Sequence, residues 1–110
     1  MTETHTAVEA QITFPDEALA LAAADRLVAA RLIACGQVAK VASVYVWEGA
    51  TEHAAEWLLT AKTTRACLAA LEADIRAHHP DAVPQITALA IAWGSADYLD
   101  WVETACQPPE

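Results

Sequence analysis

The chain has little glycine, and the phosphate-binding and catalytic motifs that depend on this residue are missing. Only three of its 110 residues are glycine. The sequence holds no G-x-x-x-x-G-K loop for phosphates, no G-x-S-x-G nucleophile turn and no H-E-x-x-H metalloprotease helix. Without these motifs the sequence shows no complete catalytic constellation. We therefore expect a binding protein rather than an enzyme.

Positive charge is also scarce. Six Lys and Arg stand against 15 Asp and Glu, which gives a formal net charge of -9 at pH 7. Such a balance disfavours binding to nucleic acid and to anionic lipid. It attracts cations, although an acidic surface more often serves solubility alone. We therefore expect no nucleic-acid partner, and divalent metal ions stay on the list of candidate partners.

The three cysteines do not form a disulfide framework. Cys35, Cys67 and Cys106 stand far apart with no C-x-x-C pair, and an odd number cannot be fully paired. This usage is typical of a reducing compartment, so a cytoplasmic location is expected.

Neither a leader peptide nor a membrane span is predicted. The first five residues include an acid but no Lys or Arg. The longest apolar stretch, residues 18–35, is interrupted by Asp25, Arg26 and Arg31. A helix that crosses a bilayer would not carry these charges without need, so no membrane insertion is expected.

Apolar periodicity and turn residues divide the chain into a short series of elements. Strands are expected at 7–14, 38–47, 55–63 and 83–93, and helices from 15 to about 31, over 64–79 and over 96–104. Residues 48–52 are expected to form a loop rather than a tight turn. The order β-α-β-β-α-β plus a tail helix predicts an α+β, ferredoxin-like fold with a four-stranded antiparallel sheet. We expect one domain over residues 1–110, ordered from about 7 to 105.

One face of the predicted sheet has no helix to cover it. The strand at 38–47 looks buried on both sides, and Tyr45 and Trp47 lie on one of them. The chain is 55% hydrophobic and only 19% charged, which is more apolar than the interior of one small domain requires. We therefore expect copies of the chain to pack sheet against sheet, with the aromatic residues at the interface.

Two adjacent histidines are the strongest candidate metal ligands. His78 and His79 end the second predicted helix before Pro80, and neutral imidazole is the commonest nitrogen ligand for copper and zinc. The alternative is that they only favour a helix C-terminus through the dipole. Asp81 adds a nearby carboxylate, although an aspartate in a turn more often bonds its own backbone.

Cys35 is a third candidate ligand. Its thiolate would suit Cu(I), but no basic residue nearby would lower its pKa, so a role as a small buried apolar residue is the commoner alternative. Glu56 and Lys62 are six residues apart on one predicted strand, so they face the same way. Burial at a subunit contact would require a partner for each of them.

Short segments across the chain carry a resemblance to a known family. They are Thr13–Glu17, Leu32–Cys35, Ser43–Gly49, Glu56, Lys62–Thr63, His78–Pro80, Val83–Pro84 and Tyr98–Trp101. In this order and spacing the chain resembles the CutA family, the divalent-cation tolerance proteins. The resemblance implies a ferredoxin-like fold, a homotrimer and a role linked to copper and other divalent metals. Asp81 and Gln85 differ from the family pattern, which usually has Tyr and Glu at these positions.

The sequence is therefore compatible with two functions. The first is a cytoplasmic homotrimer for divalent-cation tolerance that binds copper or another divalent cation at inter-subunit sites near His78, His79 and Cys35. The second is a trimeric signalling or scaffold protein that binds a small metabolite or a protein partner in the same clefts and has no metal function.

Overall fold

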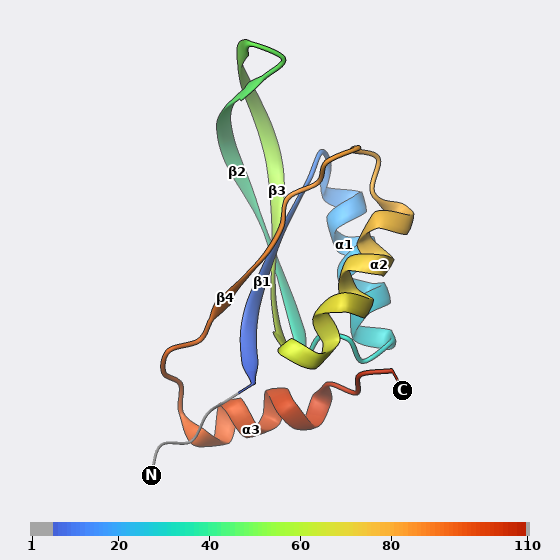
Figure 1. Cartoon of the computed structure of the whole chain (residues 1–110), viewed down its shortest axis with the longest axis vertical. Helices are drawn as coiled ribbons and strands as arrows, with labels where there is room; N and C mark the ends of the chain where they lie inside the picture. Colours follow the sequence, from blue (N-terminus) through green and yellow to red (C-terminus); the bar gives the residue numbers. More distant parts are fainter. Residues whose placement is uncertain (1–5, 110) are drawn as a thin grey trace.

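The computed structural model describes residues 6–109, which form one antiparallel sheet and three α-helices (Figure 1). The elements are β1 (Ala7–Phe14), α1 (Glu17–Ala29), β2 (Cys35–Trp47), β3 (Ala50–Thr64), the 3₁₀ turn η1 (Arg65–Cys67), α2 (Leu68–His78), β4 (Ile86–Ala90) and α3 (Ala96–Ala105). The strand order is β2-β3-β1-β4, with every neighbouring pair antiparallel. This arrangement confirms the predicted ferredoxin-like α+β fold.

The core lies between the sheet and helices α1 and α2, which cover the same face (Figure 1). In β1 the burial alternates, and Val8, Ala10, Ile12 and Phe14 are nearly inaccessible to solvent. This alternation follows from the period of a strand, whose successive side chains point to opposite faces. The core also takes in the inward residues of the two helices, which are Ala20, Ala23, Leu27, Leu71 and Ile75.

Helix α1 begins and ends at identifiable caps. The Asp16 carboxylate accepts a hydrogen bond from the Leu19 amide at 2.8 Å, so the helix starts at Glu17. It stops at Ala29, two residues before the predicted end, because Arg31 adopts the left-handed conformation with a φ of 61°. The amides of Arg31 and Leu32 donate to the carbonyls of Val28 and Leu27, which is a Schellman motif with arginine in the position that glycine usually takes.

Arg31 also ties the end of α3 to this cap. Its guanidinium donates to the carbonyls of Thr104 and Ala105, both at 3.2 Å, and its own carbonyl accepts from the Gln107 amide at 2.8 Å. At the other terminus the Thr6 carbonyl accepts from the Arg65 amide at 2.9 Å. Both described ends of the chain are thus attached to the body of the domain.

Strands β2 and β3 extend beyond the rest of the sheet as a long two-stranded arm (Figure 1). Glu48 and Gly49 alone form its turn, with φ values of 50° and 81°, and Trp47 pairs directly with Ala50. Positive φ at both central residues is the type I′ geometry that suits a tight hairpin. The predicted loop at 48–52 is therefore wrong. Polar residues such as Thr51 and Glu52 remain in the ladder because the arm is exposed, where a polar side chain has no cost.

The fourth strand is much shorter than predicted. Ladder pairing covers only Ile86–Ala90, whereas the sequence pattern predicted a strand over 83–93. Residues 91–95 leave the sheet and lead into α3, where Gly94 packs so closely that an added Cβ would lie 2.9 Å from the Leu99 side chain. The strand therefore ends where the chain must turn to meet the last helix.

The predicted second helix also differs at both ends. Its first residues form the η1 turn, and α2 itself stops at His78, with His79 in an extended conformation before Pro80. An extended residue before proline is expected on steric grounds. No helix among residues 6–109 is long and apolar enough to cross a membrane.

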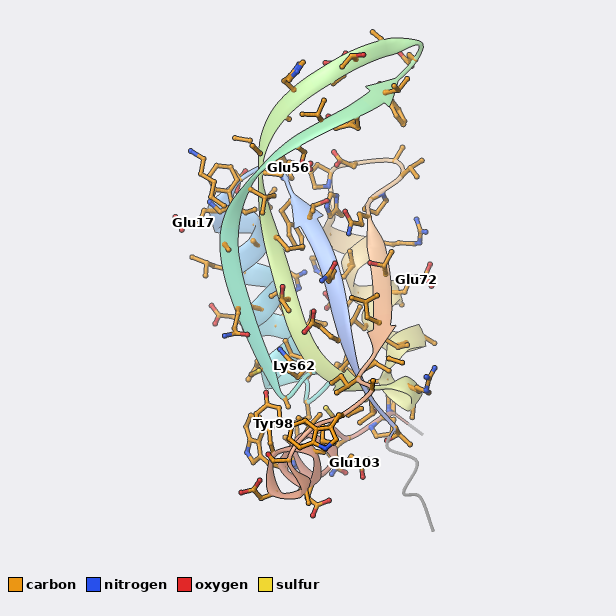
Figure 2. All side chains as sticks on the ribbon, turned by 90° about the vertical axis from the view of Figure 1, so that its left-hand side faces the viewer. Glu17, Glu56, Lys62, Glu72, Tyr98 and Glu103 are labelled. Atoms are coloured by element: carbon orange, nitrogen blue, oxygen red, sulfur yellow. The ribbon has the colours of Figure 1, made fainter. Side chains whose placement is uncertain are left out.

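The face of the sheet opposite the helices, here called the open face, remains exposed in the single chain (Figure 2). Strand β2 was expected to be buried on both sides, but on the arm Val44 and Val46 are 64% and 70% exposed, and Tyr45 and Trp47 are 44% and 51% exposed. Within one chain the prediction is wrong, because the arm extends past the helices that cover the sheet. These side chains give the single chain an exposed apolar surface of the kind that often marks an interaction site.

Candidate functional site

His79 is held inside the domain by contacts on every side of its ring. Its side chain is fully buried and stacks on Phe14, with ring centroids 4.9 Å apart. The Asp81 amide donates to Nδ1 at 3.1 Å, and Nε2 lies 2.7 Å from the Thr13 carbonyl oxygen. Because an amide can only donate, Nδ1 carries the lone pair and Nε2 carries the proton. Both ring nitrogens are therefore already used by the backbone.

His78 is placed differently, on the exposed side of the last turn of α2. Its Nδ1 lies 2.9 Å from the carbonyl oxygen of Asp74, to which it can only donate. Nε2 is left with its lone pair toward solvent and has no partner among the described residues. A histidine that donates through one nitrogen to a carbonyl and presents the other is the usual arrangement of a metal-binding imidazole.

The Asp74 carboxylate lies beside His78 but is bound elsewhere. Its Oδ1 is 3.9 Å from His78 Nδ1 and 2.9 Å from the guanidinium of Arg26. Arg26 therefore takes most of the hydrogen-bonding capacity of this carboxylate. The residues near His78 offer one free imidazole nitrogen rather than a complete ligand set.

Cys35 lies at the opposite end of the sheet from the histidines. It pairs with Lys62 across β2 and β3, and Lys62 pairs with Glu9 of β1, so the three form one row on the open face. Lys62 Nζ is 3.5 Å from Glu9 Oε1. His79 contacts Thr13, which is four positions beyond Glu9 on β1. At the usual rise per residue, the row of Glu9, Lys62 and Cys35 therefore lies about 13 Å along the strand from Thr13. Within residues 6–109 no group of three or more metal-binding side chains comes together.

Tyr98 of α3 closes the row at its Cys35 end (Figure 2). Its hydroxyl oxygen is 3.6 Å from Cys35 Sγ, and its ring contacts that of Trp101. Burial first, then the contact with Cys35 and the charge of Glu9, raise the pKa of Tyr98 from 10.0 to about 12. The phenol therefore stays protonated, and thus able to donate, over the whole physiological range.

The Tyr98 phenol is expected to ionise near pH 12, and Cys35→Ala should lower this pKa toward 10. Between pH 10 and 12 the unfolded chain releases the phenol proton while the folded chain keeps it, so the free energy of unfolding falls across this window. The decrease should be small because the side chain is 39% exposed. Phenolate absorbance in a Tyr45→Phe background measures the ionisation. An unchanged titration in Cys35→Ala would show that the thiol contributes nothing.

A groove of about 680 Å³ lies between the arm and the segment that follows α2. Its polar lining residues are Thr13, Ser43, Glu56, Asp81 and Gln85, and its apolar lining includes Val44, Tyr45, Trp47 and Val83. Glu56 lies where the arm leaves the body of the sheet (Figure 2). The volume is in the range of small-molecule sites. We refer to this cavity as the arm groove.

The sequence pattern did not predict the arm groove. It correctly placed Glu56 and Lys62 on one face of β3 and predicted a partner for each if they are buried at a subunit contact. In the single chain Lys62 bonds Glu9, and Glu56 opens into the groove. The sequence predicts Asp81 as a carboxylate near the histidines, and Asp81 and Gln85 as departures from the family pattern, but not as walls of a cavity. The alternation of Ser43, Tyr45 and Trp47 on one face of β2 was the available signal, but the partner wall, residues 80–85, has no periodicity to reveal it.

Comparison with known proteins gives a consistent result. The family model described as CutA1 divalent ion tolerance protein matches residues 8–105. The chain is 41% identical to the divalent-cation tolerance protein CutA of Thermus thermophilus over 92 residues, which are 83% of this chain and 89% of that protein. It is 36% identical to the divalent-cation tolerance protein CutA of Escherichia coli over 101 residues, 91% of this chain and 90% of that protein.

Solved structures with the same fold carry similar names. The divalent cation tolerance protein from Thermus thermophilus superposes with a TM-score of 0.89 at 37% identity, covering 92% of this chain and 99% of that one. CutA1 from Oryza sativa gives a TM-score of 0.90 at 31% identity over 94% and 96% of the two chains. A structure from Archaeoglobus fulgidus described as periplasmic gives 0.87 at 30% identity, covering 90% and 97%.

Proposed function

Because this chain belongs to the CutA1 divalent ion tolerance protein family, we propose that it acts as a cytoplasmic homotrimer that binds divalent cations, copper among them, at sites between subunits. The observation that carries the proposal is the free Nε2 of His78, held outward by the bond from Nδ1 to the Asp74 carbonyl. The net charge of -9 supports it, because it concentrates cations near the surface.

The positions of the three candidate ligands support a site shared between subunits. Cys35 begins β2, whereas His78 ends α2 beside His79, which contacts the far end of β1, so a single ion could take both only from different chains. His79 can supply a ligand only if its bonds to Thr13 and Asp81 are broken, and we assign it to holding the end of α2 instead. Imidazole and thiolate are ligands that copper and zinc prefer, and a bound cation would be held rather than transformed.

The test is a calorimetric titration of the reduced protein with Zn²⁺ and Cu²⁺. We expect saturable binding that His78→Ala weakens by about tenfold or more, because it removes the one outward imidazole lone pair of α2. His53→Ala is the matched control, since His53 is an exposed histidine on the arm, away from α2, and its removal should leave the affinity unchanged. Cys35→Ser reports whether the thiol takes part. Absence of binding, or an equal loss in both histidine variants, would contradict the metal function.

The arm groove favours a second function. A trimeric signalling or scaffold protein that binds a small metabolite or a protein partner would use a cavity of this size without any metal. Its lining differs from the family pattern at Asp81 and Gln85, so the ligand of this member need not be that of its relatives. A ligand-dependent rise in melting temperature, without metal affinity, would support this function.

A further inference from the structure

Three polar side chains that line the arm groove lack partners among the residues that the structure describes. Among residues 6–109, the side chains of Ser43, Glu56 and Gln85 make no hydrogen bond or ion pair, although Glu56 and Ser43 are only partly accessible. Among the described residues no buried side-chain oxygen or nitrogen lacks a partner, so the Glu56 carboxylate still reaches solvent and is open to a ligand that enters the groove. This feature differs from the row at the other end of the open face, where Glu9 is bound by Lys62 and Gln11.

The lining of the groove also has one sign of charge. It includes Glu56 on the arm and Asp81 on the segment after α2, and no Lys or Arg. Asp81 Oδ2 is 3.9 Å from His79, but that ring is neutral and accepts the Asp81 amide through the same nitrogen, so the carboxylate is not neutralised. Two carboxylates in a cavity with low-dielectric walls attract a positively charged occupant.

The aromatic residues specify the kind of cation. Tyr45 and Trp47 line the groove from β2, and both are about half exposed there. An aromatic face attracts an ammonium group through its quadrupole and also covers the attached carbon chain. We propose that the arm groove binds a small organic ammonium ion, whose charged nitrogen lies against Glu56 and Asp81 and whose apolar part packs on Tyr45 and Trp47. The inference rests on the second function proposed above, not on the metal site.

Other classes of ligand fit the lining less well. No group of three metal-binding side chains exists among the described residues, and the valines of the groove offer nothing to a bare metal ion. An anion would face two carboxylates with no basic side chain in the lining. A lysine of a second copy would supply the same chemistry as a free amine, and the experiment separates these two sources.

The test uses 1,4-diaminobutane, with butane-1,4-diol and succinate as the neutral and anionic compounds of the same length. Amide chemical shifts of the full-length protein are followed at constant ionic strength, and the oligomeric state is measured in the same samples. We expect saturable shifts for residues of the arm and of 80–85 with the diamine alone. Glu56→Gln should weaken binding by about tenfold, since it removes the charge but keeps the shape. Asp25→Asn, which removes an exposed charge on α1, on the opposite face of the sheet, should have no effect.

Each other outcome has a definite meaning. Equal loss in Glu56→Gln and Asp25→Asn, or shifts that matched salt reproduces, would overturn the assignment. Shifts of the same residues with the diol or succinate, but not with the diamine, would keep the groove as a binding site and refute the cationic ligand. Binding that occurs only in a variant dissociated to monomers would show that a second copy occupies the groove, which would also overturn the proposal of a free ligand.

Discussion

Replacing His79 by alanine is expected to lower the free energy of unfolding by about 2–4 kcal/mol in metal-free buffer. The ring is fully buried, stacks on Phe14 and links the Thr13 carbonyl to the Asp81 amide. Its removal leaves a cavity and breaks two hydrogen bonds, neither of which involves a metal. Urea unfolding in the presence of a chelator, at one fixed protein concentration, measures the effect.

His78→Ala provides the matched comparison at the neighbouring position. His78 is exposed and makes a single side-chain bond, to the carbonyl of its own helix, so its loss should cost less than about 0.5 kcal/mol. The two variants should thus differ in the property that they lose: His79→Ala should lose stability, and His78→Ala should lose cation affinity. Equal stability of the two variants would mean that His79 does not hold the end of α2 as described.

The second large effect is expected on assembly. Val46→Asp should weaken self-association by about a thousandfold, because it places a charge in a contact that would otherwise be desolvated. Val46 is 70% exposed on the single chain and lies on the opposite side of β2 from Tyr45 and Trp47. Because Tyr45 and Trp47 line the arm groove on the other side of β2, we expect the partner contact on the Val46 side, where the introduced charge would be buried. Light scattering at micromolar concentration should show trimers for the native chain and monomers for the variant.

Val28→Asp is the control for this experiment. Val28 is 46% exposed on the outer face of α1, on the side of the domain away from the open face. The same change of residue should there leave the trimer intact. A native chain that is monomeric at micromolar concentration would refute the trimer, and dissociation by both variants would show that a general loss of stability, rather than the arm contact, is responsible.

The parts of the fold that the sequence predicted are those with a strong local period. β1 alternates cleanly and α1 has apolar residues at helical spacing, so both were located within two or three residues. The errors fall where a long-range contact decides the conformation. The left-handed Arg31 is fixed by the packing of the chain ends, and β4 is cut short because Gly94 has to meet Leu99.

In the candidate site, too, local patterns predicted the residue types, whereas long-range contacts decide how the residues are arranged. The adjacent histidines could be named from sequence, but their different roles depend on Thr13 and Asp74, which belong to different elements. The separation of Cys35 from the histidines follows from the strand register, which no local pattern encodes. The arm groove joins β1, the arm and an aperiodic segment, so only the assembled fold brings Glu56 and Asp81 to one cavity.

The two attachments of Arg31 couple local unfolding at the end of α1 to local unfolding at the end of α3. This one residue ends α1 with its backbone, holds the last turn of α3 with its guanidinium, and accepts from the Gln107 amide beyond α3 with its carbonyl. Neither helix end can fray without releasing bonds that belong to the other. The last turn of α3 and the end of α1 therefore form one cooperative unit for local unfolding, although more than 70 residues of sequence separate them.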